Sequence, residues 1–117
     1  MPVTIYHNPR CAKSRETLAL LRTRGVEPNI IEYLKTPPTA PQLKKLLQQL
    51  GMAARDLLRR HEPEYKSAGL NKESLTDKDI VAAMARYPKL IERPIVVVGN
   101  NAALGRPPTA VLKLLKK

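Results

Sequence analysis

The chain has little aromatic or sulfur chemistry. Its 117 residues include no Trp and no Phe, and four Tyr are its only aromatic residues. The core must therefore be built from aliphatic side chains, and a large aromatic ligand pocket is disfavoured. There is a single cysteine, so one chain can form neither an internal disulfide nor a cysteine-based metal cluster.

Long apolar runs are missing as well. The first fifteen residues contain none, and the longest later stretch is IVVVG. We therefore expect neither a signal peptide nor a membrane span, and we expect a cytoplasmic protein. A lone cysteine agrees with a reducing compartment. The length fits one domain, and no repeat or linker indicates a second.

Acidic residues are few beside basic ones. Ten Asp and Glu stand against 21 Lys and Arg, which gives a formal charge of +11. This balance favours anionic partners such as oxyanions, acidic proteins or nucleic acid. Nucleic acid is the weakest of these, because no aromatic residues are interleaved with the charges to stack on bases. No spacing of His, Asp and Glu suggests a metal site, and we expect no bound cofactor.

The N-terminal third alternates between strand and helix patterns. PVTIYH is typical of a strand, and the NP that follows should end it in a turn. Residues 12–24 have helical periodicity, with Gly25 placed to terminate the helix. PNIIEYL indicates a second strand. Residues 2–34 therefore predict a βαβ unit with parallel strands.

The middle of the chain is helical in pattern. Thr39 and Gln42 have the spacing of a capping box, before leucines at helical intervals and a terminating Gly51. A short helix is expected around residues 53–60, then an irregular stretch, then a helix capped by Thr76 and closed by Pro88. We expect a helical insertion over approximately residues 39–88.

The C-terminal part predicts a hairpin and a last helix. PIVVV and AALG flank a GNN turn that tolerates positive φ, and Val111, Leu114 and Leu115 mark an amphipathic helix. The order βαβ, helices, ββα predicts an α/β, thioredoxin-like fold. Its four-stranded mixed sheet and the helical insertion would form a single domain over residues 1–117.

The lone Cys11 stands at the predicted start of the first helix. A lone cysteine is most often a buried, inert side chain. Here, however, a helix N-terminus lowers the pKa of a thiol, and Arg10, Lys13 and Arg15 add positive charge in the sequence around it. Ser14 could donate a hydrogen bond to the sulfur, and His7 could pair with it. These features predict a nucleophilic thiolate.

The same helix N-terminus is an anion site, so nucleophile and anion would share one place. The natural substrate is an oxyanion attacked at its central atom. Cysteine-dependent phosphatases usually have an arginine six residues after the cysteine, whereas this chain has Thr17 there. Arsenate, which thiols can reduce by two electrons, fits better.

Several motifs together resemble the glutaredoxin-coupled arsenate reductase family, the thioredoxin-fold ArsC type. They run from about Val3 to the C-terminal helix: IYHNPRCAKSRETL, YLKTPPT, LLRR, ERPIVVV and GRPP. HNPRCAKSR is most similar to housekeeping members that are not encoded beside arsenic-resistance genes.

The resemblance implies a set of site residues. Cys11 would attack arsenate, and the arginines that match the family's substrate-binding positions are Arg59, Arg93 and Arg106. Arg60 follows Arg59 directly, so either could be the first of these. Pro94 matches the cis-proline that thioredoxin-like folds hold beside the thiol. We expect His7 to tune or neutralise the thiolate and Ser14 to hydrogen-bond it, with neither acting as a catalyst.

With no second cysteine in the chain, the adduct must be resolved from outside. Glutathione would do this as cosubstrate, and a glutaredoxin would reduce the mixed disulfide. Two alternatives remain open at this point. One is a regulatory module of the same fold that binds RNA polymerase, although relatives of that kind commonly carry a cysteine pair. The other is a glutathione-dependent thiol exchange protein.

Overall fold

The strand–helix–strand pattern at the N-terminus forms as predicted. A computed structural model describes residues 2–115. Strand β1 (Val3–His7) leads into helix α1 (Ala12–Thr23), and strand β2 (Asn29–Glu32) follows. β1 and β2 pair in parallel, with Ile5 opposite Ile30. This is the βαβ unit expected from the alternation of β-branched and helical segments.

The predicted hairpin completes the sheet. Strands β3 (Ile95–Val98) and β4 (Asn101–Leu104) pair antiparallel, and β3 also pairs antiparallel with β1. The strand order is β2-β1-β3-β4, which is a four-stranded mixed sheet. The turn between β3 and β4 uses the expected glycine: Gly99 has φ 61°. A side chain there would be strained.

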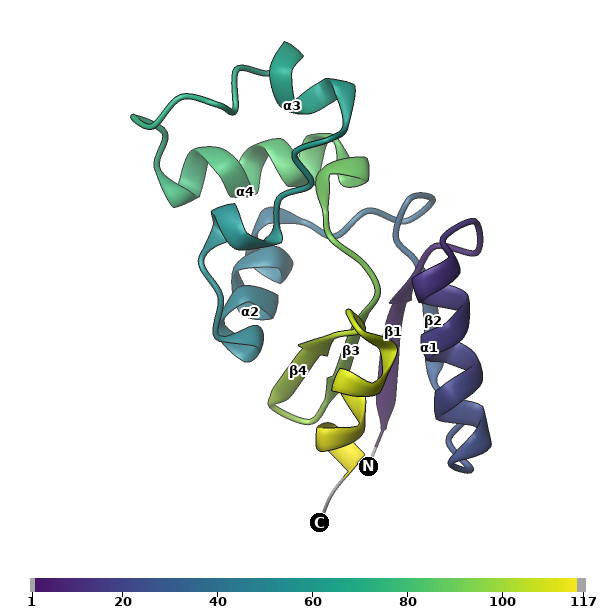
Figure 1. Cartoon of the computed structure of the whole chain (residues 1–117). Helices are drawn as coiled ribbons and strands as arrows, with labels where there is room; N and C mark the ends of the chain where they lie inside the picture. The colour runs from purple at the N-terminus through teal and green to yellow at the C-terminus, as the bar shows by residue number, and fades with distance from the viewer. Residues whose placement is uncertain (1, 116–117) are drawn as a thin grey trace. The chain divides into compact units, whose positions relative to one another are not determined.

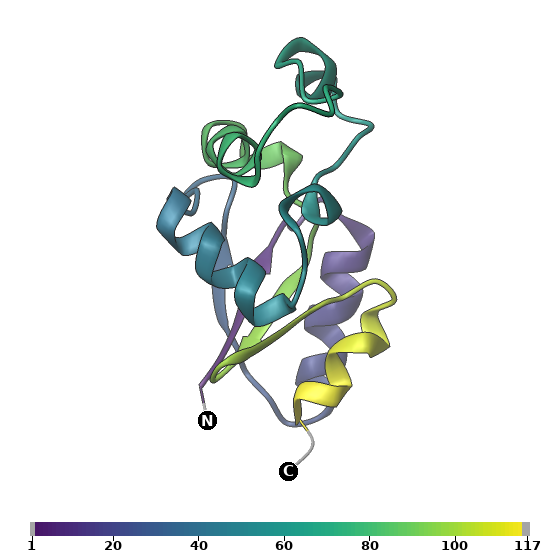
Figure 2. The same cartoon turned by 90° about the vertical axis from the view of Figure 1, so that its left-hand side faces the viewer.

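One face of the sheet is covered by α1 and by the C-terminal helix η3 (Pro108–Leu115), which contact each other. Figure 2 shows the two lying along the strands. Their shared core is aliphatic, as the composition requires; its buried members are Ile5, Leu18, Leu21, Val96, Val98, Ala103 and Val111. The last helix was expected to be α-helical, but it has 3-10 geometry. Its amphipathic pattern suits both kinds of helix.

The chain divides into two compact units. The first contains the sheet and consists of the segment up to Thr36 and the segment from Arg93 onward; the second is Pro37–Glu92. The second unit holds helices α2 (Ala40–Leu50), α3 (Pro63–Ser67) and α4 (Asp77–Arg86), labelled in Figure 1. It also holds the 3-10 helices η1 (Ala54–Leu57) and η2 (Pro88–Leu90).

Two capping boxes start the long helices of the second unit. Thr39 Oγ1 accepts the main-chain N–H of Gln42 at 3.3 Å, and Gln42 Oε1 accepts that of Thr39 at 2.9 Å, which confirms the predicted cap. Thr76 caps α4 in the same way, with Asp79 as its partner. Each cap satisfies two N–H groups that would otherwise lack partners.

The sequence prediction was wrong about two short helices. The helix expected around residues 53–60 is only a four-residue 3-10 helix, η1. Conversely, the stretch expected to be irregular contains the five-residue α3. Helices this short show too few turns for apolar periodicity to mark them.

Candidate active site

Cys11 is the N-cap residue of α1. Its backbone is extended, with φ −95° and ψ 123°, and its carbonyl accepts the N–H of Arg15 at 3.0 Å. Its own N–H donates to the carbonyl of Asn8, also at 3.0 Å. The side chain is partly exposed. The thiol therefore stands where the first N–H groups of the helix lack helical acceptors.

Two arginines distant in sequence reach the sulfur. Nη2 of Arg106 lies 3.9 Å from Sγ of Cys11, and its Nε donates to the carbonyl oxygen of Arg93 at 2.8 Å. The Arg93 guanidinium also hydrogen-bonds the thiol. These arginines flank the hairpin, just before β3 and just after β4. Because Ile95 and Leu104 are paired across it, the two ends lie together.

The pKa of Cys11 lies below its usual value. Burial raises the pKa, but stronger combined effects oppose it: the main-chain N–H of Ser14, a hydrogen bond and the charge of Arg93, and the main-chain N–H of Lys13. The N-terminus of α1 and the Arg93 guanidinium thus both stabilise the charged form of the Cys11 sulfur. Such an environment favours the thiolate, which is the reactive form of cysteine.

The cations next to Cys11 in sequence have other partners. Lys13 pairs with Glu16 at 3.8 Å, and Nη1 of Arg15 donates to the carbonyl of Pro9 at 3.0 Å. Lys13 stabilises the thiolate through its main chain, and Arg93 supplies the side-chain charge. The electropositive surroundings predicted from the sequence exist, but they come from a different part of the chain.

Ser14 and His7 form a buried pair behind the cysteine. Oγ of Ser14 is 2.6 Å from Nδ1 of His7 and accepts the main-chain N–H of Asn8 at 3.0 Å. The expectation that the Ser14 hydroxyl and the His7 ring both pair with the sulfur therefore needs correction. The hydroxyl and Nδ1 bond to each other, and it is the main-chain N–H of Ser14 that stabilises the thiolate.

The pKa of His7 lies below its usual value. Burial lowers it most, Glu32 on the neighbouring strand raises it, and Arg22 and Arg15 lower it. The ring is therefore neutral near pH 7. A neutral imidazole cannot serve as a counter-ion for the thiolate, which leaves that role to Arg93.

Asn8 holds the loop in shape, a role that the sequence analysis missed. It is buried, and its Oδ1 accepts the N–H of Arg10 at 3.0 Å. Its carbonyl accepts the N–H of Cys11. The Asn-Pro pair was interpreted only as a strand breaker. Asn side chains often hydrogen-bond the main chain two residues further on, and this tendency could have predicted the bond to Arg10.

Pro94 belongs to a tightly packed junction. The Arg93–Pro94 and Arg106–Pro107 peptide bonds are both cis. The N–H of Gly105 donates to the carbonyl of Pro94 at 2.9 Å. A Cβ added at Gly105 would lie 2.7 Å from Cγ of Pro94 and still closer to Oγ1 of Thr17. The lack of a side chain at Gly105 thus lets β4 approach α1 just before Arg106.

Arg59 lies in the second unit, where carboxylates surround it. Its Nε is 3.4 Å from Oε1 of Glu62, and its Nη1 is 3.6 Å from Oε1 of Glu92. Its main-chain N–H donates to the carbonyl of Leu90 at 2.7 Å. The side chain is only 21% exposed, whereas Arg60 is an exposed residue. Arg59 is therefore the more buried of the two candidates.

Residues 2–115 offer no group of three or more His, Cys, Asp or Glu side chains arranged to hold a metal ion. Within the same residues, no helix combines the length and hydropathy needed to cross a membrane. The chemistry of the site described above is that of a thiol and two guanidinium groups.

Residues 6–114 match the model of the ArsC family. The chain belongs to the ArsC family. Among its curated relatives, Escherichia coli YfgD, described as uncharacterized, is 52% identical over 97% of this chain and 96% of its own length. The arsenate reductase of Escherichia coli is 45% identical over 97% of this chain and 80% of its own length.

A solved structure of an ArsC relative has the same fold. The arsenate reductase from Vibrio cholerae superimposes with a TM-score of 0.95 at 52% identity, covering 97% of this chain and 98% of its own. The thioredoxin-like α/β fold expected from the order of strands and helices is thereby confirmed.

Proposed function

We propose that this ArsC-family protein reduces arsenate to arsenite with Cys11 as the nucleophile. The observation that carries the proposal is the convergence of Arg93 and Arg106 on the sulfur of Cys11 at a helix N-terminus. A guanidinium fork can bind two oxygens of a tetrahedral oxyanion. The arginines that stabilise the thiolate can therefore also hold its target.

The reaction starts when the Cys11 thiolate forms a bond to arsenic and one arsenate oxygen leaves as water after protonation. Glutathione then supplies the second thiol. Forming a disulfide between Cys11 and glutathione transfers two electrons to arsenic, which departs as arsenite. A glutaredoxin thiol exchanges with this mixed disulfide and restores Cys11. External thiols are needed because the chain has no second cysteine.

Arg59 is proposed as the third arginine that binds the oxyanion. Its support is the family motif LLRR together with its mostly buried, ion-paired side chain. Arg60 is exposed, which favours a solvated surface charge at that position.

The test is arsenite production with arsenate, glutathione and glutaredoxin present. We expect the wild-type protein to turn over and Cys11→Ser to be inactive, because the serine hydroxyl supplies neither a thiolate nor an electron pair for a disulfide. Mass spectrometry of the wild-type protein after omission of glutaredoxin should reveal glutathione on Cys11. Turnover by Cys11→Ser would sink the proposal.

A second arm separates arsenate reduction from general thiol exchange. The same thiolate could attack a glutathionylated protein, a reaction that needs no oxyanion. If the wild-type protein deglutathionylates such a substrate but makes no arsenite, the protein is a thiol exchange protein instead. Capture of RNA polymerase from a lysate together with no turnover in either assay would favour the regulatory module.

A further inference from the structure

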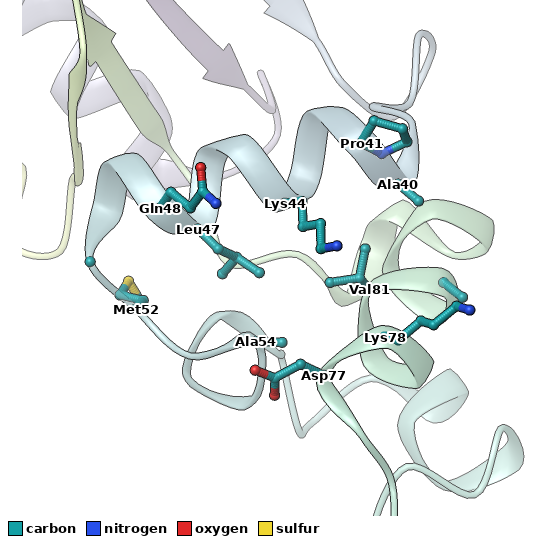
Figure 3. Close-up of a pocket in the computed structure, with 12 residues that line it drawn as sticks. Ala40, Pro41, Lys44, Leu47, Gln48, Met52, Ala54, Asp77, Lys78 and Val81 are labelled. Atoms are coloured by element: carbon teal, nitrogen blue, oxygen red, sulfur yellow. The ribbon is translucent and has the colours of Figure 1, made fainter.

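The second unit contains a groove lined by residues other than those of the cysteine site. It lies between α2 and α4 with η1 at its base, and Figure 3 shows its walls. The cavity measures about 840 Å³, within the range of roughly 300–1,000 Å³ that is typical of small-molecule sites. Its lining residues are Ala40, Pro41, Lys44, Leu47, Gln48, Gly51, Met52, Ala54, Asp77, Lys78, Val81 and Ala82.

Part of the groove's lining consists of small residues. Ala40 and Gly51 lie on the α2 side and Ala82 on the α4 side, and none of them can fill the space between the helices. The deepest side chains are apolar: Leu47, Val81 and Ala54 are all buried. The base of the groove therefore favours a hydrocarbon.

Lysines from both helices border this apolar base. Lys44 extends from α2 into the space between the helices, and Lys78 comes from α4 (Figure 3). The ion pairs seen among residues 2–115 involve neither lysine. Asp77 also lines the groove, and because it lies in the first turn of α4 the helix dipole offsets part of its negative charge.

Asp79, next to Lys78, is already engaged. The main chain and hydroxyl of Thr76 bond to it as part of the capping box and hold its pKa below the usual value, with a smaller contribution from Lys78. The charged side chains that line the groove are those of Lys44, Lys78 and Asp77, so the lining carries a net charge of +1, the same sign as the formal +11 of the chain.

We propose that this groove binds a small amphipathic anion, namely an aliphatic carboxylate of medium chain length. Its hydrocarbon part would lie on Leu47, Val81 and Ala54, and its carboxylate would reach Lys44 and Lys78. None of the lining residues is aromatic, so stacking gives no preference for a ring. The proposal is independent of the reaction at Cys11.

Decanoate, below its micelle concentration, is the probe. In a titration of the ¹⁵N-labelled full chain we expect saturable amide shifts confined to α2, η1 and α4. Decyltrimethylammonium, which has the same chain and the opposite charge, should bind at least about fivefold more weakly, as expected for exposed charge pairs. Equal binding of the two would overturn the proposal, as would the absence of saturable shifts.

Charge reversal in the groove has a matched control on the same helix. Lys44→Glu should weaken decanoate binding about fivefold, whereas Lys45→Glu, at an exposed position outside the lining, should change it by less than about twofold. Both substitutions are at exposed positions, so circular dichroism should show two folded proteins. Equal losses in the two variants would mean that the net charge of the protein, not the groove, attracts the ligand.

A filling variant tests the apolar part. Ala82 is exposed at the edge of the groove, and Ala82→Phe should block decanoate without unfolding α4. Unchanged affinity in a folded Ala82→Phe protein would place the ligand elsewhere.

A second copy of the chain is the competing occupant of the groove. Amide shifts in α2 and α4 that depend on protein concentration without any ligand would show that a second copy covers the groove, which also contradicts the proposal.

Discussion

Two arginine environments in this molecule differ in what the guanidinium groups point at. In the first unit, Arg93 and Arg106 come from the two ends of a hairpin and reach the sulfur of Cys11. In the second unit, Arg59 is held between the carboxylates of Glu62 and Glu92. In the first unit Arg93 lowers the pKa of the Cys11 thiol and Arg106 contacts its sulfur, whereas in the second unit Arg59 is paired with carboxylates.

The backbone explains how each arrangement is held. Arg106 Nε is bonded to the carbonyl of Arg93, so the two arginines of the hairpin are fixed to each other. Arg59 is fixed by a short antiparallel bridge, in which Leu58 pairs with Ile91 and Glu92 N–H donates to Leu57. An oxyanion that binds Arg59 must compete with two carboxylates, so we expect a smaller contribution from it.

The largest expected effect is at Arg93. Arg93→Ala removes a hydrogen bond and a charge from the thiolate and one fork from the oxyanion, so kcat/KM for arsenate should fall by about 10²–10³. The pKa of Cys11, measured by alkylation, should rise. Arg10→Ala is the control: it removes a cation beside Cys11 in sequence, and we expect little change. A larger pKa rise in Arg10→Ala than in Arg93→Ala would reverse the comparison.

Next comes Gly105, which acts on the first unit through packing. The Cβ of Gly105→Ala would meet Thr17 and Pro94, and overpacking of this kind costs about 1–3 kcal/mol of unfolding free energy. Urea unfolding measures the loss. Thr17→Ala removes one of the colliding atoms, so the double variant should recover part of the unfolding free energy lost in Gly105→Ala. Independent, additive losses would show that the two residues are not coupled.

The second unit is tested by the two neighbouring arginines. Arg59→Ala should lower kcat/KM for arsenate about tenfold, which is the loss expected for one charge-assisted contact. Arg60→Ala should keep kcat/KM within about twofold of the wild-type value. The coupled assay measures both, and the pair carries its own control because each variant loses one positive charge. A greater loss in Arg60→Ala would move the third arginine by one position.

The smallest effect concerns pH. A depressed pKa means that the folded state favours the thiolate, so Cys11 adds stability above its unfolded pKa and loses it as pH falls through the folded pKa. Alkylation of the native protein should therefore reach its half-maximal rate at lower pH than alkylation in urea. Identical profiles in the two states would remove the case for an activated cysteine.

Much of the fold could be predicted from local patterns. The βαβ unit, the β3–β4 hairpin and the capped helices α2 and α4 follow from alternation, glycine positions and capping residues. The short helix α3 could not be predicted, because five residues contain too few turns to show periodicity. The 3-10 geometry of η3 was missed because Val111 and its neighbours fit both helix types.

Less of the candidate site than of the fold could be predicted from local sequence patterns. The lone Cys11 and its position at a helix start were evident from the sequence, and Arg93 and Arg106 were found only through a family resemblance. The local cations Lys13 and Arg15 were assigned to the thiol, but they bond to Glu16 and Pro9 instead. Side chains with several rotatable bonds take the nearest good partner, which sequence distance does not reveal.

The sequence alone determined that the chain carries a single thiol and that this thiol sits at the start of a helix. Only the tertiary structure decided which charges act on it. The reason is that electrostatic and hydrogen-bond energies depend on distance in space, and pairing of β3 with β4 brings Arg93 and Arg106 to the sulfur.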